Sequence, residues 1–223
     1  EGRRVFENIL KFIVYLLSCN CAEIFLFLLC ASLGEELPFT VIMILWANII
    51  ADVPPAMALG VEPAEPGLMK REPRSAKRGI VTKASFAVII FQSLVMTMMT
   101  FAVYMLSGRG EPNDLNYEEA EKYAQAEAFC VLTSLQLLQG FLSRTMRTSV
   151  VKINPFTNRW MIAGVLLSFV LMIMGIYVNG LNDILQLQPI NGMSWVKIVV
   201  CCAILIILSE VEKLILRITK AVL

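Results

Sequence analysis

The stretch LWANIIADVPPAMALG, residues 45–60, lies inside an apolar segment long enough to cross a bilayer. It nevertheless carries an amide at Asn48, a carboxylate at Asp52 and the consecutive prolines Pro54 and Pro55. A carboxylate in hydrocarbon is costly, and such residues usually mark an ion pathway. Two prolines in mid-span remove backbone hydrogen bonds, which predicts a helix that is unwound at this pair. Because both costs fall on the same few residues, the stretch predicts an ion site.

Composition points to a membrane protein. Hydrophobic residues make up 57% of the 223 residues, and the mean hydropathy is +0.71, whereas soluble proteins are about 45–50% apolar. The net charge of +1 argues against a nucleic-acid partner. There is no histidine, so the commonest general base and metal ligand is missing. The six cysteines lie in apolar stretches, which favours small buried side chains over a disulfide framework or a zinc site.

The apolar segments predict an all-α integral membrane protein, a six-helix transmembrane bundle that forms one domain over residues 1–223. The expected spans are residues 5–33, 38–61, 84–106, 128–143, 160–178 and 194–216. Residues 62–83 hold three prolines and many charges and predict an extended cytoplasmic connector. The last span is the weakest, and its charged side chains are expected to reach the lipid headgroups from near its ends: Lys197, Glu210, Glu212 and Lys213.

The basic residues predict the orientation of the bundle. One side of the predicted topology collects all of the 19 lysines and arginines except Arg109, Lys122 and Lys197. Both termini are therefore expected in the cytoplasm. The sequence does not indicate whether the protein lies in the plasma membrane or in an internal membrane. The loop after the third span is expected to face away from the cytoplasm. It is also expected to be acidic, because it contains Glu111, Asp114, Glu118, Glu119 and Glu121. The chain starts at Glu1 without a methionine, from which we expect a fragment of a longer polypeptide.

The other polar residues of the spans could complete the site. Asn20 and Glu23 share one face of the first span, since they are three residues apart. The two prolines lack the N–H groups that would bond the carbonyls of Ile50 and Ala51. The fourth span adds a polar face that includes Gln136. Carboxylate, amide and carbonyl oxygens suit a hard cation such as Ca²⁺, although helix-to-helix pairing or a simple kink also explains single members of this set. The predicted cation ligands are Asn20, Glu23, Asn48, Ile50, Ala51, Asp52 and Gln136.

With these residues the chain resembles the carboxy-terminal membrane half of type II P-type cation ATPases, which include the sarco/endoplasmic reticulum calcium pumps and the fungal sodium pumps. The resemblance covers essentially the whole chain, in order, through EGRRVFENILKFIVYLLSCNCAE, LWANIIADVPPAMALGVEP, LMKREPRS and NPFTNRW. It implies that the six spans are the last six of a ten-span bundle. The partners that it implies are the bilayer and the remaining spans and cytoplasmic domains of the same pump, with any regulatory subunit unknown.

The resemblance also implies ligands, and two positions depart from it. The calcium pump's ligands fall on Asn20, Glu23, Asn48 and Asp52, but a threonine ligand is replaced by Ala51 and a glutamate ligand by Gln136. These departures favour a pump that moves one divalent ion per cycle, or one adapted to Na⁺. SAKRGIVT is similar to the sodium pumps, whereas the acid at Asp52 speaks against them.

No catalytic residue is assigned. The chain has no D-K-T-G-T phosphorylation motif, so Mg-ATP would act only through domains absent from it, and the chain alone should be inactive. The resemblance favours the transport half of an ATP-driven cation pump, for Ca²⁺ first and Na⁺ next. The alternatives are a passive cation channel or secondary transporter complete in six spans, and a fragment that does not transport.

Overall fold

The computed structural model describes residues 1–64, 80–107, 117–145, 148–150 and 154–219. Within these ranges the chain is α-helical and contains no β-strand, which confirms the predicted fold class. A short helix, α7 (Leu181–Leu185), and a 3-10 turn, η4 (Pro155–Thr157), lie in connections. The long helical segments are α1 (Gly2–Leu33), Val41–Gly60, α4 (Lys83–Leu106), α5 (Tyr117–Leu142), α6 (Arg159–Tyr177) and α8 (Gly192–Ile218).

Local capping explains where several helices begin and end. The side chains of Thr40, Thr82, Asn158 and Asn191 each accept a hydrogen bond from the backbone N–H three residues on, at 3.4, 3.1, 3.0 and 2.9 Å. Gly34 ends α1 with a φ of 73°, in the left-handed region that glycine adopts without strain. Capping residues in the sequence therefore set four of the helix starts and the end of α1.

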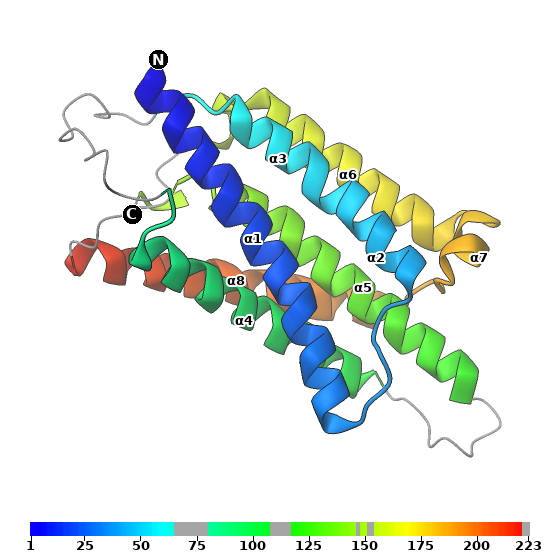
Figure 1. Ribbon diagram of the computed structural model, residues 1–223. Helices are drawn as coiled ribbons and strands as arrows, with labels where there is room; N and C mark the ends of the chain where they lie inside the picture. Colours follow the sequence, from blue (N-terminus) through cyan, green and yellow to red (C-terminus); the bar gives the residue numbers. More distant parts are fainter. Residues whose placement is uncertain (65–79, 108–116, 146–147, 151–153, 220–223) are drawn as a thin grey trace.

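Helix α5 occupies the centre of the bundle (Figure 1). The segments α3 (Val53–Gly60) and α6 lie side by side along one flank, α4 and α8 lie along the other, and α5 contacts all four. Successive long helices run in alternating directions, so that α1 starts and α8 ends at the same end of the bundle (Figure 1). Residues of α5 are buried almost continuously from Ala124 to Leu142. Polar side chains on α5 must therefore find partners inside the bundle.

The second span differs from its prediction. In place of unwinding at the prolines, α2 (Val41–Ala47) continues through a π-helical turn, η1 (Asn48–Asp52), into α3 (Val53–Gly60). Pro54 and Pro55 occupy the first turn of α3, where helical N–H groups commonly lack an intrahelical acceptor, so prolines are tolerated there. The π turn is the local irregularity, and such turns are frequent at functional sites.

Three further expectations are corrected. Glu118, Glu119 and Glu121 lie in α5 rather than in an acidic loop, because YEEAEKYAQAEA consists mainly of strong helix formers. The helix that contains the predicted fourth span, residues 128–143, therefore starts earlier, at Tyr117. Glu212 and Lys213 do not extend to the surface but are buried, with 9% and 3% exposure. Glu111, Asp114 and most of the predicted connector 62–83 lie outside the described residues.

Among the described residues, four segments are long and apolar enough to cross a membrane: Gly2–Leu33, Val41–Gly60, Lys83–Leu106 and Arg159–Tyr177. The other two predicted spans, in α5 and α8, are long helices with a more polar composition. Their polar groups lie mostly against other helices rather than on the outside, as the burial of Gln136, Gln139 and Glu212 shows. The number of six spans stays a prediction.

Candidate ion-binding site

The predicted ligands of α1, η1 and α5 meet inside the bundle. The Asn20 amide nitrogen donates to Asp52 Oδ2 at 3.3 Å and to the Leu16 carbonyl at 2.8 Å. The Gln136 amide nitrogen donates to Glu23 Oε1 at 2.9 Å. Both carboxylates are 6% exposed. Each carboxylate is therefore held by one amide from a neighbouring helix, and neither forms an ion pair with a lysine or arginine of the described residues.

Several oxygens of this region are buried and have no hydrogen-bond partner. They are Asp52 Oδ1, Asn48 Oδ1, Gln136 Oε1 and Thr133 Oγ1. Buried polar atoms are normally paired, and leaving one unpaired costs about 1–3 kcal/mol. All four are oxygens that can act as ligands of a hard cation. The set thus offers two carboxylates and unpaired neutral oxygens, which fits a cation such as Ca²⁺ better than a further hydrogen bond.

The two predicted backbone ligands have different surroundings. The Tyr15 hydroxyl donates to the Ala51 carbonyl at 2.7 Å, so one protein group already bonds that oxygen. Tyr15 is fully buried on α1, and the sequence analysis did not single it out. A tyrosine in an apolar helix leaves no polar periodicity that would reveal this role. Ile50 is likewise fully buried, and its carbonyl stays a predicted ligand.

Two glycines let the proline segment approach the neighbouring helices closely. A methyl group at Gly140 of α5 would lie 2.9 Å from Pro55 Cβ, and one at Gly164 of α6 would lie 3.1 Å from the Pro54 carbonyl oxygen. The prolines that follow Asp52 are thus packed between two glycine surfaces. Side chains at either glycine would push α3 outward, which gives both glycines a positioning role for the site.

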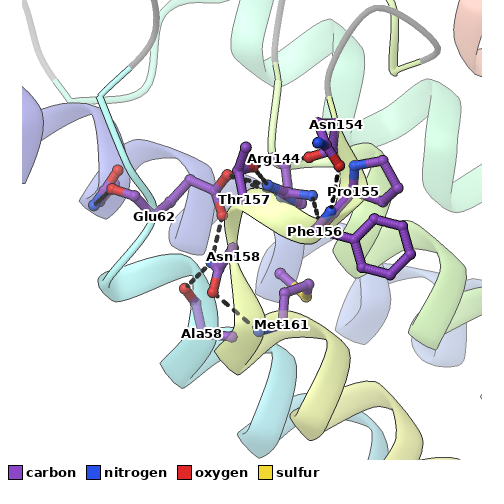
Figure 2. Close-up of polar contacts among 10 residues, drawn as sticks. Ala58, Glu62, Arg144, Asn154, Pro155, Phe156, Thr157, Asn158 and Met161 are labelled. Atoms are coloured by element: carbon purple, nitrogen blue, oxygen red, sulfur yellow. Dashed lines mark hydrogen bonds and ion pairs between the residues drawn. The ribbon is translucent and has the colours of Figure 1, made fainter.

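A buried ion pair holds the end of α3 that we predict to face the cytoplasm (Figure 2). Arg144, after α5, pairs with Glu62, after α3, at 2.8 Å, and both side chains are at most 6% exposed. Asn158 donates to the second Glu62 oxygen and to the Ala58 carbonyl, the latter at 2.9 Å. Asn8 of α1 donates to the Glu62 carbonyl at 2.9 Å. We call these four residues, Asn8, Glu62, Arg144 and Asn158, the Glu62 clamp.

The NPFTNRW stretch supplies the rest of this corner. Arg144 donates to the Pro155 carbonyl at 3.0 Å and to Thr157 Oγ1 at 2.6 Å (Figure 2). Asn154 caps the turn η4 by accepting from the Phe156 N–H at 2.9 Å. The quoted stretch is therefore a folded corner that receives the guanidinium group and starts α6.

Neither cysteine nor acidic clusters compete with this site. Within the described residues, no three histidine, cysteine, aspartate or glutamate side chains gather in a way that could hold a metal ion. None of the six cysteines, all of which lie in the described residues, forms a disulfide, and Cys19, Cys30, Cys130 and Cys201 are buried. A cation at the candidate site would therefore depend on amide and hydroxyl oxygens in addition to Glu23 and Asp52.

Fold and site together define an all-α membrane domain with a buried polar centre between its helices. The family model described as "Cation transporting ATPase, C-terminus" matches residues 36–215. A calcium-transporting ATPase of Bacillus cereus is 32% identical over 96% of this chain and 25% of its own length. One of Bacillus subtilis is 36% identical over 92% of this chain and 22% of its own length. The chain thus spans about a quarter of these curated relatives.

The chain belongs to the family of cation-transporting ATPase carboxy-terminal domains. It is an integral, multi-pass membrane domain, since the family match is joined by four helices that are apolar enough to span a bilayer. The predicted resemblance to the carboxy-terminal membrane part of P-type cation ATPases is confirmed. A particular likeness to the sarco/endoplasmic reticulum or fungal sodium pumps stays a prediction.

Proposed function

We propose that this chain forms the ion-binding membrane part of an ATP-driven calcium pump. The observation that carries the proposal is the pair of buried carboxylates, Glu23 and Asp52, beside unpaired buried oxygens of Asn48, Asp52 and Gln136. The chemistry is that of a hard cation with oxygen ligands. The relatives of Bacillus cereus and Bacillus subtilis are both called calcium-transporting ATPases, which supports the choice of Ca²⁺.

Charge favours one Ca²⁺ per transport cycle. The two carboxylates carry two negative charges and balance a single divalent ion, whereas Gln136 and Ala51 add none. In a low-dielectric site a second divalent ion would leave an uncompensated positive charge, which is strongly unfavourable. Sodium is the second candidate, because an amide at Gln136 is a weaker ligand for a divalent ion than a carboxylate.

The remainder of the pump would supply the chemistry. Phosphoryl transfer needs an acceptor residue and a cradle for phosphate and Mg²⁺, and we place these, with Mg-ATP, in other domains of the same polypeptide. Both termini of the chain would lie in the cytoplasm. Helix α1 would then connect a cytoplasmic stalk to Glu23, and a shift of α1 against η1 would change the distance between Glu23 and Asp52 and thereby the affinity for the ion.

The test uses the full-length polypeptide that contains this chain, in membranes, with labelled ATP. We expect Ca²⁺-dependent phosphorylation in the wild type and its loss in Asp52→Asn and Glu23→Gln. Asp183→Asn is the matched control, since Asp183 lies exposed on α7. Normal Ca²⁺ dependence in both site variants would overturn the assignment, and stimulation by Na⁺ alone would replace Ca²⁺. Ion flux without ATP would favour a passive channel or secondary transporter.

A further inference from the structure

A second buried carboxylate lies outside the candidate site, where α8 packs against α4 and α5. Glu212 of α8 is 9% exposed, and its Oε2 accepts a hydrogen bond from the Gln92 amide nitrogen of α4 at 2.8 Å. The Gln92 amide oxygen in turn accepts from the Gln139 amide nitrogen of α5. Ser18 of α1 lies at 3.5 Å from the same oxygen. Gln92 therefore contacts the carboxylate directly, and it links Glu212 to Gln139 and Ser18 on two further helices.

Glu212 has no ion-pair partner within 4.0 Å among the described residues, and Lys213 attracts it only from a longer distance. Its neighbour Lys213 instead donates to the Leu142 carbonyl at 2.9 Å and lies 3.8 Å from Glu210. A buried carboxylate without a paired charge is strongly unfavourable unless something neutralises it. The amide from Gln92 supplies a hydrogen bond but no charge.

Two buried oxygens beside this carboxylate also lack a partner. Gln139 Oε1 is unpaired although its amide nitrogen is bonded within the cluster, so this oxygen lies there as well. Ser209 Oγ is unpaired, and Ser209 precedes Glu212 by three residues, on the same face of α8. Gln139 is fully buried and Ser209 is 1% exposed. Gln139 is linked to Glu212 through Gln92, and Ser209 shares the α8 face of Glu212. We infer that one cation could take the carboxylate and both unpaired oxygens as ligands.

We propose that Glu212, Gln139 and Ser209 form a binding site for one alkali cation, Na⁺ or K⁺, and that Gln92 holds the Glu212 carboxylate in place through its amide nitrogen. The donor atoms are all oxygens, which excludes a preference for soft metals. A single carboxylate balances a single positive charge, whereas a divalent ion would leave net charge inside the bundle. The ion would join α5 and α8. Gln139 follows Gln136 by three residues on α5, so this alkali site is one helical turn from the candidate calcium site.

The test measures thermal unfolding of the purified full-length polypeptide in detergent, with Ca²⁺ chelated so that the proposed calcium site is empty. NaCl, KCl and choline chloride are titrated separately at constant ionic strength. We expect Na⁺ or K⁺ to raise the melting temperature of the wild type above its value in choline, because a ligand of the folded state stabilises it. The comparison of the two alkali chlorides identifies the preferred ion.

Variants decide whether Glu212 is responsible. Glu212→Gln should abolish the alkali-dependent rise, while Glu210→Gln, two residues away with Glu210 bonded to the Val150 N–H, and Asp52→Asn should keep it. Ser209→Ala, a small change, should weaken the apparent alkali affinity roughly three- to tenfold, as expected for one neutral ligand. Equal curves in choline and alkali chloride for the wild type, or an unchanged rise in Glu212→Gln or in Ser209→Ala, would overturn the proposal. None of these outcomes depends on calcium transport.

Discussion

Replacement of Arg144 by methionine tests the Glu62 clamp most directly. Arg144 pairs with Glu62 at 2.8 Å and donates to Pro155 and Thr157 at 3.0 and 2.6 Å. Arg144→Met retains much of the side-chain length and removes the charge. Glu62 then keeps only the amide of Asn158 as a side-chain partner and becomes a buried, unpaired anion. Breaking a buried ion pair in this way typically costs about 3–5 kcal/mol.

Two further variants separate the charge from the geometry. Arg144→Lys keeps a positive charge but loses the planar group that reaches three acceptors at once. Loss of two hydrogen bonds should cost about 1–3 kcal/mol. The double variant with Glu62→Gln and Arg144→Met removes both charges, so no unpaired ion remains. We therefore expect it to be more stable than Arg144→Met alone.

The assay is thermal unfolding of the full-length polypeptide in detergent. Unfolding is monitored by the labelling of the buried cysteines with a thiol-reactive dye. The expected order of melting temperatures is wild type, Arg144→Lys, the double variant, and then Arg144→Met. The last should melt on the order of 10 °C below the wild type, by the conversion for soluble domains of this size. A double variant that is as unstable as the sum of its single variants would refute the reasoning, since it would show no coupling between Glu62 and Arg144.

Three other substitutions test the packing and pairing around the site by the same melting assay. Gly140→Ala should destabilise by about 1–3 kcal/mol, because its methyl group would lie 2.9 Å from Pro55; an unchanged melting temperature would contradict that close contact. Tyr15→Phe should cost about 1 kcal/mol, since it removes a buried donor at 2.7 Å, and equal stability would argue against this bond. Lys197→Met leaves Glu127, fully buried and 2.9 Å away, without its charge partner. We expect Lys197→Met to lower the free energy of unfolding by about 3 kcal/mol, the low end for buried pairs, because Lys197 is 31% exposed. A gain in stability from this variant would refute the stabilising role of the pair.

Part of the candidate site can be predicted from spacing alone. Asn20 and Glu23 share a helix face by their three-residue separation, and Asn48 and Asp52 by their four-residue separation. Acidic and amide side chains stand out in apolar segments because such segments otherwise exclude them. Spacing does not predict which side chains form hydrogen bonds across helices. In the structure Asn20 donates to Asp52, and Gln136 donates to Glu23. These pairs join helices that are distant in sequence, so their contacts depend on how the helices pack.

Charges near helix ends were the least predictable feature. In the linear sequence Glu62 and Arg144 belong to charged, proline-containing connections, and Glu212 lies near the end of a span, all typical of solvated positions. In the folded chain all three are buried. The reason is that residues outside the apolar segments are covered only when several helix ends meet, as they do around the Glu62 clamp.

The sequence by itself determined the all-α membrane class, the approximate positions of the long helices and the polar stretch LWANIIADVPPAMALG. These follow from hydropathy, capping residues and the cost of placing a carboxylate in an apolar segment, which are local properties. Tertiary structure alone decided that this stretch stays helical through a π turn, with its prolines packed against Gly140 and Gly164. It also decided which buried oxygens remain unpaired. Both outcomes depend on neighbours from other helices, whose approach no local pattern encodes.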